Sequence, residues 1–185
     1  KEMFSFQGAG RESVTKAILI SHFYDSRDGD IPLRRQGIRV KTFISHSREE
    51  TIALGERIGA AAPSGAVIAF KGGLGAGKTT LSKGIARGLG IEEEICSPTY
   101  TIISEYPGRL LLRHMDAYRL RGDADFEEIG GVELLGVPGS LCLIEWSEKL
   151  PESIDADAAV IEIEMSPNGD RRFTLIGGWM EVLIP

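Results

Sequence analysis

Apolar and polar positions along the chain change their spacing several times, and each spacing predicts a different element. Short, uninterrupted apolar runs at 66–70 and 141–144 are typical of strands buried on both faces of a sheet. Apolar residues alternate with glutamates at 159–165, and Asn168-Gly169 then predicts a hairpin turn into a strand at 173–176. Three further strands are expected at 42–44, 101–106 and 110–118, the last two forming a hairpin.

Helical patterns occur in three segments. Ser47 followed by Glu50 fits a capping box and predicts a helix that continues to about Ala62. A second helical pattern follows residue 77, and a third, at 125–135, is interrupted by two glycines. The second helix is expected to end near Gly88 or Gly90. The expected buried faces are Leu54, Ile58 and Ala61 in the first helix and Leu81, Ile85 and Leu89 in the second.

Together these elements predict an α/β fold, with a mixed sheet flanked by helices and antiparallel edge strands toward the C-terminal end. The working domain is expected at 41–185. Residues 1–40 contain one apolar cluster, at 17–20, followed by a charged stretch rich in turn residues. We therefore expect residues 1–40 to form a poorly ordered N-terminal extension.

Composition narrows the class of protein. At 185 residues the chain is long enough for one stable domain, and its net charge of −6 argues against wholesale binding to a phosphate backbone. Cys96 and Cys142 give no disulfide framework, which favours a reduced, cytoplasmic setting. The sequence contains no run of eighteen apolar residues, so no membrane association is expected.

A glycine-rich stretch carries the clearest chemistry. It lies between the apolar run at 66–70 and the second helix, and it fits the P-loop pattern GxxxxGK[ST]. Glycines permit positive φ angles and bring bare amides close to phosphate oxygens at the positive end of a helix. Lys78 would bind the β/γ-phosphates, and the Thr79 hydroxyl would take one Mg²⁺ position. The expected nucleotide-binding residues of this P-loop NTPase-type fold are Gly72, Gly73, Leu74, Gly75, Ala76, Gly77, Lys78, Thr79 and Thr80.

Two acids follow strands of the predicted sheet. Glu145 comes directly after the run at 141–144, and Asp116 continues a buried-looking strand that has no structural need for a carboxylate. Ligands of open α/β sheets lie beyond the carboxyl ends of the strands. We therefore expect both acids to hold Mg²⁺ or to orient an attacking water, and assign catalytic roles to Lys78, Asp116 and Glu145.

Other polar residues are weaker candidates. Thr99 and Thr101 lie where switch segments often contact the γ-phosphate, although by residue type alone both are ordinary loop residues. Trp146 directly after Glu145 is more often a core residue than a ligand contact. The three histidines show no metal-ligand spacing with the cysteines, so no zinc site is expected.

The nucleotide is expected to be ATP. The single asparagine, Asn168, is followed by Gly169, so the guanine-reading motif NKxD cannot occur. No arginine-rich lid of the kind that small kinases close over two substrates is evident. Water is therefore a better acceptor than a metabolite. Two alternatives remain open, namely a small-molecule P-loop kinase and a nucleotide-gated binding module that does not need hydrolysis.

Four motifs in this order resemble the TsaE family of small P-loop ATPases. They are the loop at 72–80, Ser-Pro-Thr-Tyr-Thr at 97–101, His-Met-Asp-Ala-Tyr-Arg-Leu at 114–120, and Ile-Glu-Trp at 144–146. The resemblance covers residues 41 to about 178. It implies ATP binding and slow hydrolysis in partnership with TsaB and TsaD, which form N6-threonylcarbamoyladenosine at position 37 of tRNA. Contact with tRNA is then expected only through that complex.

The resemblance also implies individual roles. Thr79 and Glu145 would hold Mg²⁺, Asp116 would support the metal or the attacking water, and Thr99 would act as the switch residue. Trp146 would shape the site, and ATP or ADP would also contact Arg171 and the segment 47–51. The chain departs from the family at Gly73, where the family usually has Asp, and in residues 1–40, which have no counterpart in the family's short form.

Overall fold

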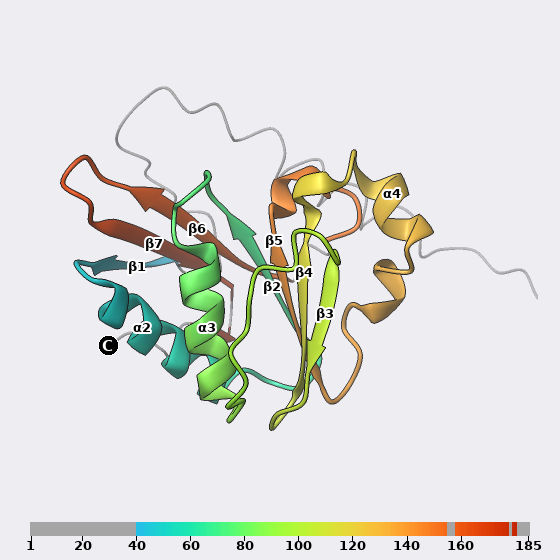
Figure 1. Ribbon diagram of the computed structural model, residues 1–185, viewed down its shortest axis with the longest axis horizontal. Coiled ribbons are helices and arrows are strands. Elements are labelled where there is room, and N and C mark those ends of the chain that lie inside the picture. Colours follow the sequence, from blue (N-terminus) through green and yellow to red (C-terminus); the bar gives the residue numbers. More distant parts are fainter. Residues whose placement is uncertain (1–39, 155–157, 178, 181–185) are drawn as a thin grey trace, which may run out of the picture. The chain divides into compact units, whose positions relative to one another are not determined.

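The computed structural model describes residues 40–154, 158–177 and 179–180. The predicted N-terminal extension, apart from Val40, lies outside the described residues. Within them, seven strands form one sheet in the order β1-β7-β6-β2-β5-β4-β3 (Figure 1). The strands are β1 (Val40–Ser45), β2 (Ala66–Lys71), β3 (Ile103–Tyr106), β4 (Leu111–Asp116), β5 (Ser140–Glu145), β6 (Ala159–Met165) and β7 (Arg171–Ile176).

The centre of the sheet is parallel and both flanks are antiparallel. Strands β6, β2, β5 and β4 run in the same direction. Strand β7 pairs antiparallel with β6 and β1, and β3 pairs antiparallel with β4. This mixed sheet with antiparallel edges confirms the predicted fold class.

Helices cover both faces of the sheet. On one face α2 (Arg48–Ala61) and α3 (Lys78–Gly88) pack over a core that includes Phe70, Leu143 and Phe173, all fully buried (Figure 1). The other face carries a smaller core around Phe126, covered by α4 and three short 3-10 turns. These elements are α4 (Asp123–Glu128), η1 (Ala117–Arg119), η2 (Val132–Leu134) and η3 (Ser147–Lys149).

Four glycines bring α2 and α3 into backbone contact. They are spaced four residues apart, Gly55 and Gly59 on α2 and Gly84 and Gly88 on α3. A Cβ atom at Gly84 would lie 2.3 Å from the Ile52 carbonyl oxygen, and one at Gly59 would lie 2.1 Å from that of Ile85. Since a side chain at either position would collide with backbone, the glycines set the distance between the two helices.

Several predicted boundaries are wrong by a few residues, for local reasons. The strand predicted at 110–118 ends at Asp116, because the Asp116 Oδ1 atom accepts a hydrogen bond from the Tyr118 N–H and starts η1. The strand predicted from Thr101 begins at Ile103, after a turn in which Ile102 has a φ of 66°. The helix predicted at 125–135 is split into α4 and η2 around the two glycines.

The first helix begins as predicted, with a variation in its cap. Ser47 Oγ accepts a hydrogen bond from the Glu50 N–H at 3.1 Å. The Glu50 carboxylate reaches back to the N–H of His46 rather than to that of Ser47. At the other end Ala61 is exposed, contrary to prediction, and Ala62 is buried, because the chain leaves the helical conformation at Ala62.

No helix in the described part of the chain is both long enough and apolar enough to cross a membrane.

The close contact at Gly84 predicts that alanine will destabilise the protein there, although alanine normally stabilises a helix relative to glycine. Replacing Gly84 by Ala raises intrinsic helix propensity, yet the new methyl group meets the Ile52 carbonyl. We expect Gly84→Ala to lower the free energy of unfolding by about 1–3 kcal/mol, measured by urea denaturation. The comparison is Ala53→Gly at an exposed position of α2, which propensity alone should destabilise by about 1 kcal/mol. An increase in stability for Gly84→Ala would contradict the packing argument.

Candidate functional site

Three segments meet at one edge of the sheet because their strands are parallel. Strand β2 ends at Lys71 and leads into the glycine loop, β4 ends at Asp116, and β5 ends at Glu145. Asp116 and Glu145 are direct partners in the β4–β5 register. The two acids therefore stand side by side, next to the loop that follows β2.

The glycine loop depends on positive φ angles. Gly72, Gly75 and Gly77 have φ angles of 153°, 75° and 114°. Gly72 also lies against β6, where a Cβ would be 2.7 Å from the Ile163 carbonyl oxygen, and Gly77 is the N-cap of α3. The loop thus turns directly into the amino end of a helix, where free amides favour anions. At Gly73 a Cβ would meet nothing within 4 Å, so the space there would accept a side chain.

Lys78, the first residue of α3, is buried beneath the loop. Its Nζ atom donates hydrogen bonds to the carbonyl oxygens of Gly72 (2.7 Å) and Gly73 (2.9 Å). The same atom lies 4.0 Å from the centre of the Trp146 ring, which is a cation–π contact. Burial lowers the pKa of the ammonium, and the negative charge of Glu145, more than that of other nearby acids, opposes this shift.

Glu145 accepts hydrogen bonds from two other elements. The Thr79 hydroxyl on α3 lies 3.2 and 3.4 Å from its two carboxylate oxygens. Nε2 of His114 on β4 lies 2.9 Å from Oε1. Glu145 is only 3% exposed, so these contacts replace most of the water that an isolated carboxylate would require.

Asp116 binds the loop that precedes β3. Its Oδ2 atom accepts hydrogen bonds from Ser97 Oγ (2.9 Å) and Thr99 Oγ1 (2.7 Å), and these two hydroxyls lie 2.8 Å from each other. Asp116 is buried, so it connects this loop firmly to the end of β4. Thr101, the other threonine considered from the sequence, contacts Ser104 on the exposed side of the hairpin instead.

Trp146 closes one side of the site. It has a φ of 60°, in the left-handed region where non-glycine residues are uncommon. Ser147 holds the following turn in place by donating a hydrogen bond to the Phe70 carbonyl oxygen at 2.9 Å. The Trp146 ring stacks at a tilt on Tyr118, with 5.1 Å between ring centres. Trp146 therefore covers the Lys78 ammonium, as well as packing against the smaller core.

These residues surround a cleft of about 410 Å³. Of the predicted site residues, Gly72, Gly73 and Arg171 do not line it, although the first two bind Lys78 through their carbonyl groups. Arg171 lies behind the loop, its Cγ atom 3.9 Å from where a Cβ on Gly77 would stand. The lining residues are Leu74, Gly75, Ala76, Gly77, Lys78, Thr79, Thr80, Ser97, Thr99, Asp116, Tyr118, Glu145 and Trp146.

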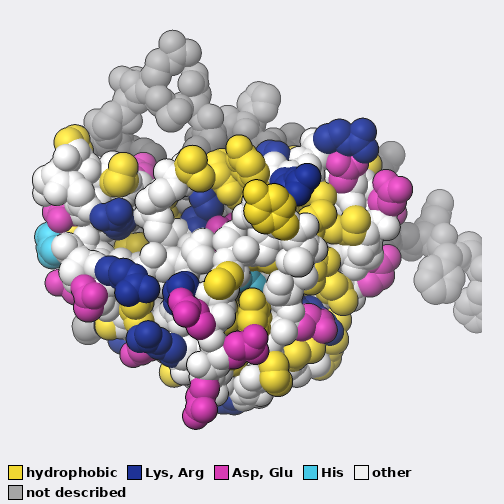
Figure 2. All heavy atoms as spheres, in the orientation of Figure 1, with side chains coloured by type: hydrophobic (Ala, Val, Ile, Leu, Met, Phe, Trp, Pro, Cys, Tyr) yellow, Lys and Arg dark blue, Asp and Glu magenta, His cyan; other side chains and the backbone are white. Residues whose placement is uncertain are grey.

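Sequence reasoning gave no role to Ser97, Tyr118 or His114. All three belong to the quoted motifs, and the available signal was their position, Ser97 two residues from Thr99 and both His114 and Tyr118 two residues from Asp116. Exposed apolar side chains also surround the cleft, with Leu74 88% and Tyr100 86% exposed. Hydrophobic side chains gather accordingly at this end of the sheet in the space-filling view (Figure 2).

The donor set suits a hard cation with additional ligands. Thr79 and Glu145 present oxygen atoms to the cleft, and Asp116 stands beside them. Among residues 40–154, 158–177 and 179–180, no group of three or more His, Cys, Asp or Glu side chains could hold a metal ion. Mg²⁺ usually takes only one or two protein ligands and completes its shell with water and phosphate oxygens, which fits this arrangement.

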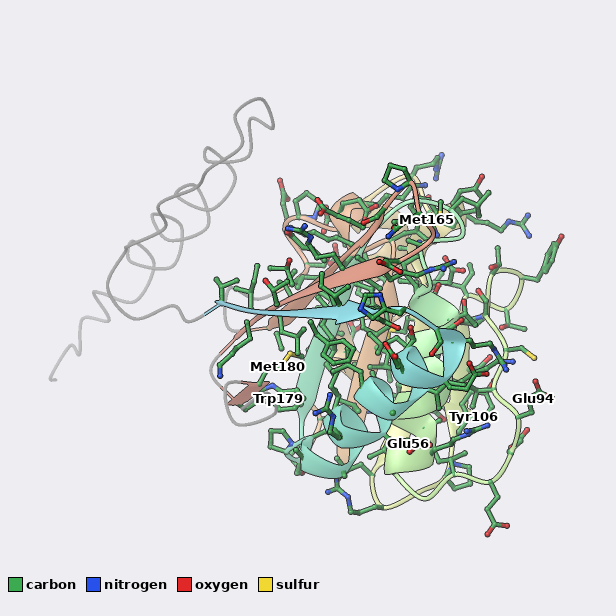
Figure 3. All side chains as sticks on the ribbon, turned by 90° about the vertical axis from the view of Figure 1, so that its left-hand side faces the viewer. Glu56, Glu94, Tyr106, Met165, Trp179 and Met180 are labelled. Carbon is green, nitrogen blue, oxygen red and sulfur yellow. The ribbon has the colours of Figure 1, made fainter. Side chains whose placement is uncertain are left out.

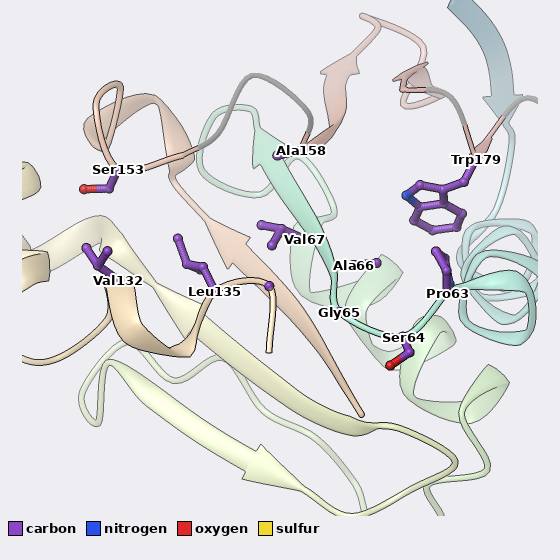
Figure 4. Close-up of a pocket in the computed structure, with 11 residues that line it drawn as sticks. Pro63, Ser64, Gly65, Ala66, Val67, Val132, Leu135, Ser153, Ala158 and Trp179 are labelled. Atoms are coloured by element: carbon purple, nitrogen blue, oxygen red, sulfur yellow. The ribbon is translucent and has the colours of Figure 1, made fainter. Parts of the chain in front are cut away.

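A second cleft, of about 440 Å³, lies at the opposite end of the sheet. Figure 4 shows Trp179 beside Pro63 on one side of it and Leu135 on the other. Figure 3 shows Trp179 and Met165, the last residue of β6, at opposite ends of the sheet. The lining residues of this second cleft include no ionisable side chain, so it offers no charge to a phosphate group.

Comparison with known proteins agrees with the geometry. The sequence model of the family described as "Threonylcarbamoyl adenosine biosynthesis protein TsaE" matches residues 45–173. The tRNA threonylcarbamoyladenosine biosynthesis protein TsaE of Treponema pallidum is 40% identical over 132 residues, 71% of this chain and 97% of that protein. The protein of the same name from Bacillus subtilis is 41% identical over 138 residues, 73% of this chain and 85% of that protein.

A solved structure supports the same conclusion. The crystal structure of YdiB from Bacillus subtilis aligns with a TM-score of 0.67 and 32% sequence identity, covering 80% of this chain and 97% of YdiB. The family match spans more than half of the chain, and the resemblance drawn from the four motifs is confirmed. The chain belongs to the TsaE family of threonylcarbamoyl adenosine biosynthesis proteins.

Proposed function

We propose that this chain binds Mg-ATP in the cleft at the glycine loop and hydrolyses it slowly, as an accessory protein to TsaB and TsaD. Its place in tRNA threonylcarbamoyladenosine biosynthesis follows from its family. The observation that carries the proposal is the contact between Thr79 and Glu145 directly beneath the loop. It joins the helix that follows the loop to the strand-end acid, as a P-loop nucleotide site with Mg²⁺ requires.

Each residue has a role that its contacts support. The Lys78 ammonium has three N–H donors, and it binds the carbonyl oxygens of Gly72 and Gly73. Because Lys78 also lines the cleft, it would redirect one of these hydrogen bonds to a phosphate oxygen of the nucleotide. The loop amides and the amino end of α3 would bind the remaining phosphate oxygens. Thr79 and Glu145 would hold Mg²⁺, which when bound supplies positive charge against the phosphate oxygens.

Asp116 would couple the nucleotide to the loop at 97–99. Its Oδ2 atom is already shared by Ser97 and Thr99, so its carboxylate holds this loop at the mouth of the cleft. A γ-phosphate or a water beside Asp116 would compete for the same hydroxyl groups. The loop would then change its contacts with nucleotide state, which is how switch segments transmit hydrolysis to a partner.

The gating alternative is favoured by this same arrangement. If ATP binding alone rearranges Ser97 and Thr99, a partner could read the loop without hydrolysis. The kinase alternative has less support, since none of the residues lining the cleft is an arginine that could clamp a second phosphorylated substrate. A phosphorylated metabolite found by mass spectrometry after incubation with ATP would favour the kinase.

Lys78 provides the first test. In Lys78→Ala the buried ammonium is lost, and we expect nucleotide affinity to fall by about tenfold or more, with phosphate release lost as well. Binding is measured by titration with a fluorescent ATP analogue, and turnover by phosphate release with Mg-ATP. The matched control is Lys83→Ala, which removes a lysine on the same helix that binds Glu94 instead of the loop. Wild-type turnover in Lys78→Ala would refute the proposed ATPase.

Glu145 separates hydrolysis from gating. We expect Glu145→Ala to reduce phosphate release by roughly 100-fold or more, because the carboxylate that would hold the cation is removed. Formation of modified tRNA by the reconstituted TsaB–TsaD system should fall with it. Glu127→Ala, at an exposed position of α4, is the control. If tRNA modification continues at the wild-type rate while hydrolysis is abolished, ATP acts by gating alone.

A further inference from the structure

A buried histidine stands behind the proposed cation site. His114, on β4, is fully buried, and its Nε2 atom lies 2.9 Å from the Glu145 Oε1 atom. Its side chain does not line the cleft. It contacts Oε1 of Glu145, the same oxygen that lies 3.2 Å from the Thr79 hydroxyl.

The strand register explains why a ring is needed there. His114 is paired with Leu143 of β5, so Glu145 is two residues further along the same face. Such diagonal neighbours are too far apart for short side chains, but long or aromatic side chains can span them. The imidazole reaches with its far nitrogen, Nε2, and this is the atom that contacts Glu145.

The second ring nitrogen indicates where the proton lies. Nδ1 of His114 is the one buried side-chain nitrogen or oxygen in the described part of the chain that has no hydrogen-bond partner. A carboxylate oxygen can only accept, so Nε2 must carry the proton that joins it to Glu145. With Glu145 ionised, the contact therefore places a proton on Nε2.

The charges around Glu145 make such a donor useful. Asp116 stands beside Glu145 in the sheet, so two buried carboxylates are neighbours, and the ammonium of Lys78 is close enough to interact with the charge of Glu145. An N–H donor at this position stabilises the ionised carboxylate and fixes its rotation. Hydrogen bonds of this kind behind a metal ligand orient it and strengthen metal binding.

We propose that His114 is a positioning residue that holds Glu145, through Nε2–H, in the rotamer that meets Thr79 and the cation of the nucleotide complex. The proposal rests on the proposed function, because it assumes that Glu145 holds Mg²⁺. The competing explanation is that His114 only fills the core beside Leu112 and Leu143. The two explanations make different predictions for substitutions that keep either the volume of the imidazole ring or its hydrogen-bond donor, but not both.

The test measures nucleotide affinity twice for each variant, with Mg²⁺ and with EDTA, using a fluorescent ATP analogue. His114→Leu fills space without a donor, and we expect the Mg²⁺-dependent gain in affinity to fall by about 10- to 100-fold while affinity in EDTA stays at the wild-type value. His114→Gln places an amide donor near the Nε2 position and should recover most of that gain. His114→Asn places its donor near the Nδ1 position, out of reach of Glu145, and should resemble His114→Leu.

Two controls keep the outcome interpretable. Leu112→Val removes buried volume from the same face of β4, and its Mg²⁺-dependent gain should stay at the wild-type value. If wild-type protein shows no such gain, the proposed function fails. If wild type shows the gain and His114→Leu keeps it, only the role of His114 is overturned.

Nuclear magnetic resonance gives a readout that needs no nucleotide. The chain has three histidines, so ¹⁵N-labelled histidine gives a simple spectrum that can be assigned with His114→Gln. We expect Nε2 of His114 to carry a proton. A bare Nε2, with the proton on Nδ1, would overturn the proposal even if the binding data agreed with it.

Discussion

The parallel pairing of β2, β5 and β4 is the constraint on which the whole site depends. Because these strands run in the same direction, the loop after β2 and the last residues of β4 and β5 must meet at one edge. The Asp116–Glu145 register then places two carboxylates next to each other, beside the amino end of α3. Two buried acids at such a distance repel each other, so the surrounding elements have to supply donors.

Those donors divide into two separate networks. Glu145 is bound from α3 by Thr79 and from β4 by His114, so both partners belong to regular elements of the fold. Asp116 is bound by Ser97 and Thr99, which belong to a loop. One acid is therefore bound by a helix and a strand, and the other by a loop. In the proposed function this asymmetry would give the two acids different roles, despite their equivalent positions at the ends of neighbouring strands.

The sequence predicted the fold, and it singled out most of the residues that line the cleft, because their signals are local. Apolar runs locate the strands, and the glycine loop, Lys78 and Thr79 form a contiguous motif. The ends of elements were less predictable, since the strand containing Asp116 stops where a side chain captures the Tyr118 amide. The partners of the acids were missed for another reason. The contacts of His114 with Glu145 and of Ser97 with Asp116 span 31 and 19 residues, and they form only once the sheet has placed the ends of β4 and β5 beside each other and beside the loop that precedes β3.

The glycines show how the same residue type can serve two unrelated constraints. Gly72 and Gly77 are required by positive φ angles, whereas Gly84 and Gly88 have helical backbone and are required by the closeness of α2. Gly73 meets neither constraint, since a Cβ there would touch nothing within 4 Å. Its contribution is the carbonyl group that binds Lys78, which any residue supplies. A charged side chain at position 73, such as the family's Asp, would therefore change the charge at the loop without a steric clash.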